Sequence, residues 1–179
     1  MRITKVTTRN GDGGKTHLAK GETVFKSDNV IHCLGEVDEL GSVIGVCLSH
    51  CKDNDISNFL KKIQNNLFDI GGHISMSLDD NSIVNENMIS DLDTQINHLN
   101  ENLEPLKEFI LPSGDHFSAN LHVARAITRR AERTAVALYK DSLLKNPVVM
   151  YLNRLSDYFF VLSRYHNMEN NLPETTWQR

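Results

Sequence analysis

Three arginines spaced four residues apart, Arg125, Arg129 and Arg133, are the side chains best placed to do chemistry, and Glu132 lies beside them. At this spacing they share one stripe of a helix whose other side is apolar. Guanidinium groups held this close repel one another unless an anion compensates their charge. The stripe indicates either an anion-binding surface or a basic face in solvent with Glu132 as partner, and the spacing alone does not decide.

A second mixed stripe follows in the last predicted helix, where Asn153, Asp157, Phe160 and Arg164 stand at i, i+4, i+7 and i+11. A polar stripe inside a bundle is costly unless every group is paired. It therefore either faces water or builds a site between helices or between subunits. We favour a site.

The first thirty residues are glycine-rich and polar and show no helical period, which predicts an extended segment. Gly14-Lys15-Thr16 matches the end of a Walker A motif, but Arg9 stands where that motif requires its first glycine, and no strand precedes it. A P-loop is therefore rejected. Small residues still let backbone N–H groups approach phosphate oxygens, with Arg9, Lys15 and Lys26 supplying positive charge. The alternative is a flexible basic tail.

Histidines and cysteines do not predict a metal site. The eight histidines are scattered, and the Glu-x-x-His pairs of a di-metal bundle are absent from the sequence. The three cysteines form an odd set without a CxxC motif, so we expect reduced thiols in a reducing compartment. Cys47 and Cys51 lie one helical turn apart and are interpreted as packing residues.

Five helices must position these residues, in a single domain of 179 residues. Apolar periodicity predicts a first helix from Glu36 to Cys51 and a second from a cap at Ser57 to a weakening near Gly71–Gly72. The third helix covers Asn85–Leu103, with Pro105 as its terminator. The fourth runs from a cap at Asp115 or Ser118 to about Tyr139, and the fifth from Pro147 to about Glu169. The third helix is less hydrophobic and is expected on the outside. No paired strands are predicted.

The fold class is therefore all-α, a five-helix bundle with an extended glycine-rich N-terminal segment. We divide the chain into an N-terminal segment (1–34), the helical bundle (35–169) and a loose tail (170–179). A net charge of −4 argues against nucleic acid as a partner. The sequence has no apolar run long enough to span a membrane and no secretory signal, so we expect a cytoplasmic protein.

Five sequence blocks, taken together, resemble the PduO-type ATP:cob(I)alamin adenosyltransferases. They are TRNGDGGKT (Thr8–Thr16), GEVDEL (Gly35–Leu40), FILPSG (Phe109–Gly114), HVARAITRRAER (His122–Arg133) and NRLSDYFFVLSR (Asn153–Arg164). They occur in the family's order. The resemblance implies a five-helix bundle, usually a homotrimer, with each active site between adjacent subunits and the N-terminal segment folded over ATP.

The resemblance also implies roles for individual residues. Those carried over as ATP contacts are Thr8, Arg9, Asn10, Gly11, Thr16, His17, Lys26, Arg129, Arg130, Glu132, Arg133 and Asn153. Magnesium is expected on the triphosphate and not on a cluster of side chains. The family pairs an acid, here Asp38, with an arginine of the neighbouring subunit, here Arg125; the competing interpretation of Asp38 is a helix-dipole acid.

The resemblance assigns two further residues to the corrin substrate. Phe109 matches an aromatic that excludes the lower axial ligand of cobalamin, and Asp157 matches an acid near the corrin; with Arg129 these form the expected catalytic set. Two departures from the family are visible. Ser113 stands where many relatives have glycine, which leaves the turn after Phe109 open, and Gly13 replaces a common lysine, whose charge Lys15 partly restores.

The expected reaction transfers the 5′-deoxyadenosyl group of ATP to cob(I)alamin and yields adenosylcobalamin and triphosphate, with a separate reductase supplying electrons. Cobalamin is thus a substrate, and positioning is the protein's main task. Two other classes stay open. One is a noncatalytic nucleotide or corrinoid sensor, and the other is a helical interaction protein whose basic stripe binds an acidic partner.

Overall fold

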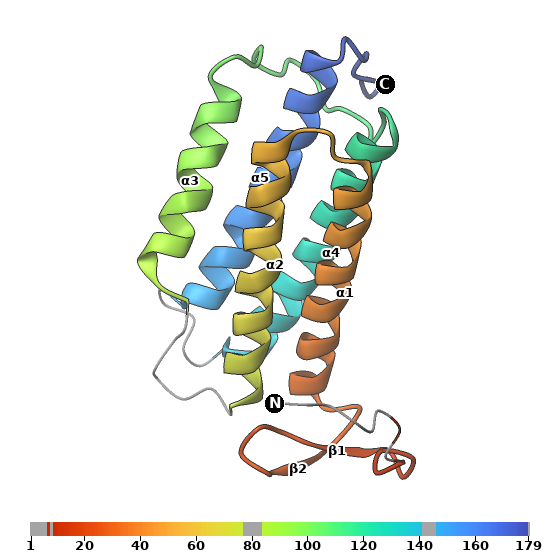
Figure 1. The fold of residues 1–179 in the computed structure, drawn as a ribbon, viewed down its shortest axis with the longest axis vertical. Helices are drawn as coiled ribbons and strands as arrows, with labels where there is room; N and C mark the ends of the chain where they lie inside the picture. The colour runs from red at the N-terminus through yellow and green to blue at the C-terminus, as the bar shows by residue number, and fades with distance from the viewer. Residues whose placement is uncertain (1–6, 8, 77–83, 141–145, 179) are drawn as a thin grey trace.

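Five helices form an all-α bundle, as predicted (Figure 1). The computed structural model describes residues 7, 9–76, 84–140 and 146–178. The helices are α1 (Asn29–His50), α2 (Asn54–Ser75), α3 (Glu86–Asn100), α4 (His116–Leu138) and α5 (Pro147–Glu169). Within the described ranges, the helices are too short or too polar to cross a membrane.

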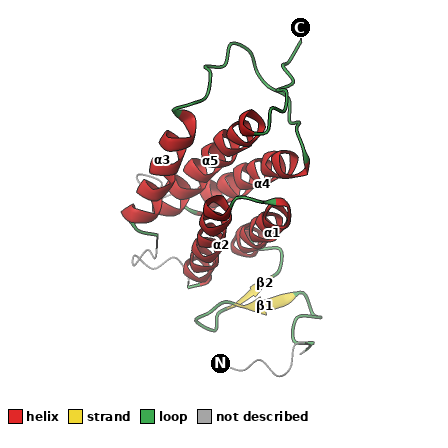
Figure 2. Ribbon diagram, turned by 45° about the horizontal axis from the view of Figure 1, so that its top comes forward, coloured by secondary structure: helices red, strands yellow, loops and turns green. Residues whose placement is uncertain are grey.

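The bundle has two layers, which Figure 2 shows obliquely: α1 and α2 lie against α4 and α5. Helix α4 packs on both α1 and α5, and α3 packs on the outer side of α5, as expected for this less hydrophobic helix. Between the layers lie fully buried side chains such as Leu40, Leu121, Leu155 and Phe159. Burial of this apolar surface is the main force that fixes the helices.

The two helices that carry the polar stripes begin and end where the sequence predicts. Asp115 caps α4, and its Oδ1 accepts a hydrogen bond of 2.9 Å from the backbone N–H of Ser118. Helix α5 opens with Pro147, while the Asn146 side chain accepts hydrogen bonds from the next two backbone N–H groups. These caps fix where both helices begin.

Helix α1 begins at Asn29, seven residues before the predicted start at Glu36. Val30, Cys33 and Leu34 extend the apolar period backwards and pack on the core. The acids taken for a first turn therefore lie well inside the helix, and Asp38 is its tenth residue. The helix-dipole interpretation of Asp38 is wrong, since that effect is confined to the first turn.

Helix α2 differs from the prediction at both ends. Asp53 caps it instead of Ser57, with Oδ1 accepting a hydrogen bond of 2.9 Å from the N–H of Ile56. The helix continues through both glycines to Ser75, because Ile70 and Ile74 on either side are fully buried. Tertiary packing here outweighs a helix-propensity cost of about 1 kcal/mol per glycine. Helix α3 ends at Asn100, ahead of Pro105, in a polar turn.

The glycine-rich N-terminal segment contains a short antiparallel hairpin, contrary to the expectation of no paired strands. Strands β1 (Lys15–His17) and β2 (Thr23–Phe25) pair with Lys15 opposite Phe25. The connecting turn includes Gly21 at φ 86°, a conformation that favours glycine. Ala19 N–H donates to the carbonyl of Ser75 (3.1 Å), which attaches the hairpin to the end of α2.

The tail is not loose, which corrects the prediction for its described part. Backbone hydrogen bonds of 2.7 Å join Leu111 N–H to the Thr175 carbonyl and Trp177 N–H to the Phe109 carbonyl. The tail thus forms a one-residue bridge, Ile110 to Thr176, with the segment that precedes α4. It lies at the end of the bundle opposite the hairpin (Figure 1).

The cysteines all lie near the core. Cys33 and Cys47 are fully buried, and Cys51 is partly buried. Burial raises the pKa of the Cys33 and Cys47 thiols to about 12. All three are free thiols, as expected.

Candidate functional site

Arg129 and Arg133 are exposed on α4, one turn apart. A guanidinium nitrogen of Arg133 donates to the backbone carbonyl of Arg129 (2.9 Å), which orients the Arg133 side chain towards Arg129. Neither has an ion-pair partner among the residues that the structure describes. The stripe is therefore not buried within one chain, and its two guanidiniums are available to an anion from outside.

Arg130, the neighbour of Arg129, has a different environment. Its guanidinium pairs with Glu39 and lies 3.7 Å from Glu36, both on α1. The Glu39 hydrogen bond and the two carboxylates raise the pKa of Arg130. Within one chain, this arginine ties α4 to α1.

A hydrogen bond joins the two polar stripes at their centre. The Asn153 amide on α5 donates to Glu132 Oε1 on α4 over 2.9 Å. Glu132 is half-buried and Asn153 is exposed. The contact brings together two residues predicted to bind ATP, beside Arg129 and Arg133, and presents a carboxylate and an amide at the same surface.

Arg125 lies further towards the start of α4, half-buried, with its guanidinium 5.9 Å from the centre of the Phe160 ring. Its Nε is buried and makes no hydrogen bond to the described residues. Asp38 is exposed on α1, and no ion pair between it and Arg125 occurs within the described chain. A buried donor without an acceptor is unfavourable, so this arginine is suited to meet a further group.

His122 lies one turn before Arg125 and was not singled out as a site residue from the sequence. It is buried, its Nδ1 makes no hydrogen bond to the described residues, and its ring lies edge-on to Phe160. Burial lowers the pKa of His122, and the charge of Arg125 lowers it further. Both effects favour the neutral form of the ring.

Asp38 borders an open groove of about 270 Å³ between α1 and α2. The groove is lined mainly by apolar side chains and glycines, including Leu34, Val37 and Leu67. Phe68, also at the groove, is 84% exposed. Large exposed apolar side chains around a groove are typical of an interaction surface.

The glycine-rich loop before β1 forms two tight turns. Asp12 N–H donates to the Arg9 carbonyl and Gly14 N–H to the Gly11 carbonyl, both over 3.2 Å. The ammonium of Lys26 lies over Gly11, where a Cβ would stand 2.7 Å from Nζ. The loop thus combines a lysine charge with closely approachable backbone, as a phosphate site requires.

The other predicted ATP residues of this segment surround that loop. Arg9 (φ 61°) and Asn10 are exposed in the turns, Thr16 is partly buried on β1, and His17 is exposed beside it. Thr8 lies outside the described residues. Lys15 extends over the Phe25 ring, with Nζ 4.9 Å from its centre.

Phe109 lies at the other end of the bundle, before α4, and is 77% exposed. Its ring meets the Trp177 ring at 65°, with centroids 6.4 Å apart. Asp157, the second residue predicted to contact the corrin, is exposed midway along α5 and lies 3.6 Å from Arg154. The structure places these two residues on different elements and records no contact between them.

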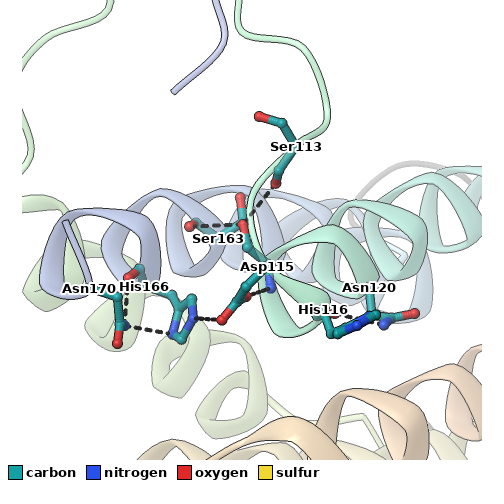
Figure 3. A network of polar contacts seen from close by, with 8 residues as sticks. Ser113, Asp115, His116, Asn120, Ser163, His166 and Asn170 are labelled. Carbon is teal, nitrogen blue, oxygen red and sulfur yellow. Dashed lines mark hydrogen bonds and ion pairs between the residues drawn. The ribbon is translucent and has the colours of Figure 1, made fainter. Parts of the chain in front are cut away.

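The turn after Phe109 is built on Gly114, not on Ser113. Gly114 adopts φ 107°, and a Cβ there would meet Ser118 Oγ at 2.8 Å. The Ser118 hydroxyl donates towards the Ser113 and Ser163 carbonyls (3.2 and 3.4 Å), and His166 Nε2 lies 2.9 Å from Asp115 Oδ2 (Figure 3). Ser113 contributes its carbonyl, which any residue can supply. The departure from glycine is therefore tolerated.

The chain is similar to known proteins over nearly its whole length. A family model described as cobalamin adenosyltransferase matches residues 6–166. A cobalamin adenosyltransferase of Cupriavidus metallidurans is 39% identical, covering 99% of this chain and 96% of its own. A corrinoid adenosyltransferase of Bacillus subtilis is 38% identical, covering 98% and 93%.

Solved structures are similar over the same length. A variant of a PduO-type ATP:corrinoid adenosyltransferase from Lactobacillus reuteri, complexed with cobalamin and ATP, superposes with a TM-score of 0.91 at 35% identity and covers 98% of this chain and 97% of its own. A second variant in complex with both ligands gives a TM-score of 0.89, covering 98% and 100%. The protein therefore belongs to the cobalamin adenosyltransferase family.

Proposed function

We propose that the protein transfers the 5′-deoxyadenosyl group of ATP to a corrinoid whose cobalt is in the Co(I) state. The nucleophilic cobalt donates its electron pair to C5′ of the ribose, the C5′–O bond breaks, and triphosphate leaves with that bond's electrons. Cobalt is thereby oxidised to Co(III) in adenosylcobalamin. Because Co(I) is itself the nucleophile, the protein needs no general base and acts by positioning and charge stabilisation.

The observation that carries this proposal is the pair of exposed guanidiniums, Arg129 and Arg133, held one turn apart without an ion-pair partner in the described chain. Charge that accumulates on the departing triphosphate is met by these groups. The Lys26 ammonium and the loop N–H groups add to them. The carboxylate and amide of the Glu132–Asn153 pair are available to the nucleoside.

The corrin is assigned to the opposite end of the α4 face. Arg129 lies 13 residues beyond the start of α4, roughly 20 Å along the axis at the usual helical rise. Phe109 precedes that start and presents an exposed ring. An apolar ring against the lower face of cobalamin would disfavour the lower axial ligand, and a cobalt without that ligand is easier to reduce. Asp157 lies between the two ends.

We further propose that two subunits of a homotrimer build each site. The hairpin is attached to α2, in the α1–α2 layer, whereas the arginine stripe lies on α4 in the other layer (Figure 2). Docking the α1–α2 groove of one subunit on α4 of the next would cover Phe68 and bring Asp38 to Arg125. The same contact would place the glycine-rich loop over the neighbour's Arg129.

Mg²⁺ is proposed to arrive with ATP. Groups of three or more histidine, cysteine or acidic side chains able to hold a metal are not found in the described part of the chain. Mg²⁺ keeps several waters and is commonly held by substrate phosphates with one or two carboxylates, and Glu132 is such a carboxylate. The ion would neutralise phosphate charge. A separate cytoplasmic reductase is proposed to supply the electron for Co(II).

The direct test incubates the protein with ATP, Mg²⁺ and chemically reduced cobalamin. We expect adenosylcobalamin and triphosphate in equal amounts, detected by the corrin absorption spectrum and by ³¹P NMR. Binding of both ligands without product would indicate a sensor. Absence of saturable ATP binding would refute the proposal and favour a helical interaction protein.

A mixing experiment tests the intersubunit site. Arg129→Ala removes the α4 contribution, and Lys26→Ala removes the loop contribution. If the two are donated by different subunits, refolding an equimolar mixture restores roughly one quarter of the sites. A mixture as inactive as either variant alone would place both residues in one subunit's site and refute the arrangement.

A further inference from the structure

The exposed ring of Phe109 is attached to a rigid support. The tail pairs with its backbone on both sides, through Leu111 N–H to Thr175 and through Phe109 to Trp177 N–H, each over 2.7 Å. These partners are more than sixty residues away in the sequence. A surface loop therefore gains the geometry of a short β-ladder at the residue proposed to face the corrin.

A buried arginine fastens both strands of this support. Arg164 on α5 is only 8% exposed, and its Nε donates to Glu174 Oε1 over 2.8 Å. Its Nη2 donates to the Glu104 carbonyl over 2.9 Å. Glu174 belongs to the tail, and Glu104 belongs to the loop that leads to Phe109. Removing one partner of a buried ion pair leaves an uncompensated charge, so the two segments are held together firmly.

The two rings form an apolar surface at this end of the bundle. Phe109 and Trp177 pack edge to face, a favourable aromatic geometry. Trp177 is 43% exposed, and Leu106 and Leu111 are exposed beside Phe109. A hollow of about 380 Å³ adjoins them, lined by residues 106–109. Exposed apolar groups on an ordered backbone are suited to binding a flat apolar ligand.

We propose that tail residues 172–177 act as a positioning element for Phe109, with Arg164–Glu174 as the fastening and Trp177 as the second ring of the apolar wall. The inference rests on the proposed function, because Phe109 acquires its role there. A ring that keeps a ligand off one face of the cobalt has to be held within about 0.5 Å. Trp177 and the tail supply that constraint through the ring contact and the two backbone hydrogen bonds.

The experiment compares Trp177→Ala, Trp177→Phe and Glu174→Gln with Phe109→Ala. Asp91→Asn is the control, since it breaks the exposed Lys62–Asp91 pair (2.6 Å) between α2 and α3. The main measurement is the fraction of bound Co(II) cobalamin without its lower ligand when ATP is present, read from absorption and EPR spectra. ATP affinity and melting temperature are measured for each variant.

We expect Phe109→Ala to lose the ligand-free Co(II) signal. Trp177→Ala and Glu174→Gln should lower it by roughly two- to tenfold, the range spanned by one aromatic pair. ATP affinity should stay within about twofold, because the phosphate contacts are distant. Trp177→Phe should retain the signal, and Asp91→Asn should match the wild type.

Trp177 is also the only tryptophan of the chain, so its fluorescence reports on the support directly. Phe109→Ala and Glu174→Gln should both shift its emission towards that of a solvated indole. This readout needs no corrinoid, so it keeps the test valid if Glu174→Gln melts early.

The outcomes distinguish the proposed role of Phe109 from the proposed role of the tail. If Phe109→Ala leaves the Co(II) spectrum unchanged, the proposed role of Phe109 is wrong, and the inference falls with it. If Phe109→Ala loses the signal while Trp177→Ala and Glu174→Gln keep it, Phe109 retains its role and the tail is not its positioning element.

Discussion

The two ends of α4 handle charge in opposite ways. In its C-terminal half, Arg129 and Arg133 are exposed, with no acidic partner in the described chain. At its N-terminal end, the neighbouring Arg164 is buried and bound by Glu174 and a backbone carbonyl, and what reaches the surface is the ring of Phe109. The arginines proposed to bind phosphate are open to solvent, whereas the arginine that holds the architecture is paired within the chain. The comparison teaches that burial and pairing separate the two uses of arginine.

The largest expected effect comes from removing an exposed arginine in the C-terminal half of α4. Arg129→Ala should lower kcat by roughly 100-fold or more, because it removes a donor to the departing triphosphate. Its free energy of unfolding should change by less than about 0.5 kcal/mol, since the side chain is exposed. Steady-state kinetics and urea denaturation check the two values. Lys52→Ala, which removes a positive charge between α1 and α2, is the control and should keep its activity.

Phe109→Ala tests the apolar end. Formation of ligand-free Co(II) should fall by more than about tenfold, which corresponds to more than about 1.4 kcal/mol. ATP binding, measured by calorimetry, should persist because the arginine stripe is intact. A variant with a normal Co(II) spectrum but weak ATP binding would reverse the assignment of the two ends.

Arg130→Ala sharpens the distinction between neighbouring arginines. Because Arg130 pairs with Glu39 and Glu36, we expect it to cost roughly 0.2–1 kcal/mol of stability, the range of exposed ion pairs. Its loss of kcat should be smaller than that of Arg129→Ala. Parallel kinetics and denaturation of both variants measure the difference. An equal loss of kcat would show that Arg130 also contacts the nucleotide, as the resemblance implies.

The smallest effect concerns Asp115, the cap at the N-terminal end of α4. Burial alone would raise its pKa, but hydrogen bonds from the Ser118 N–H and from His166 lower it overall. Since the folded pKa lies below the ordinary 3.8, the ionised carboxylate stabilises the fold above that pH, and the contribution disappears as the pH falls through the folded pKa. Asp115→Asn keeps a capping side chain.

The Asp115→Asn variant should therefore be less stable than the wild type at neutral pH, by less than about 1 kcal/mol because the pair is partly exposed. The difference should close below pH 3.8. Denaturation curves across this range measure it. A difference that stays constant with pH would mean that the carboxylate charge does not contribute.

The helices were predictable because four of them run for 22 residues or more and carry sustained apolar periods. Their boundaries were harder. Glu36, Asp38 and Glu39 resemble the acids of a first turn, yet they lie inside an established helix, where Glu36 is half-buried and the other two are exposed. The hairpin strands have only three residues each, too few for an alternating pattern to be recognised.

Of the candidate site, the sequence predicted the stripe but not which arginine is paired. Arg129 and Arg130 are adjacent and chemically identical, and only the packing of α1 beside α4 separates them. The contacts of Arg164 that attach the tail also could not be predicted from the sequence. Glu174 lies in a segment without periodicity, and the other partner of Arg164 is a backbone carbonyl sixty residues away. Such contacts depend on tertiary packing.

The buried cysteines of α1 have a chemical consequence for a protein that works on cobalt. A thiolate is both a nucleophile and a good metal ligand, whereas a protonated thiol is neither. With their pKa values raised to about 12, Cys33 and Cys47 stay protonated at neutral pH and have no access to solvent. They cannot compete with cobalt for the ribose carbon, and they cannot coordinate the metal.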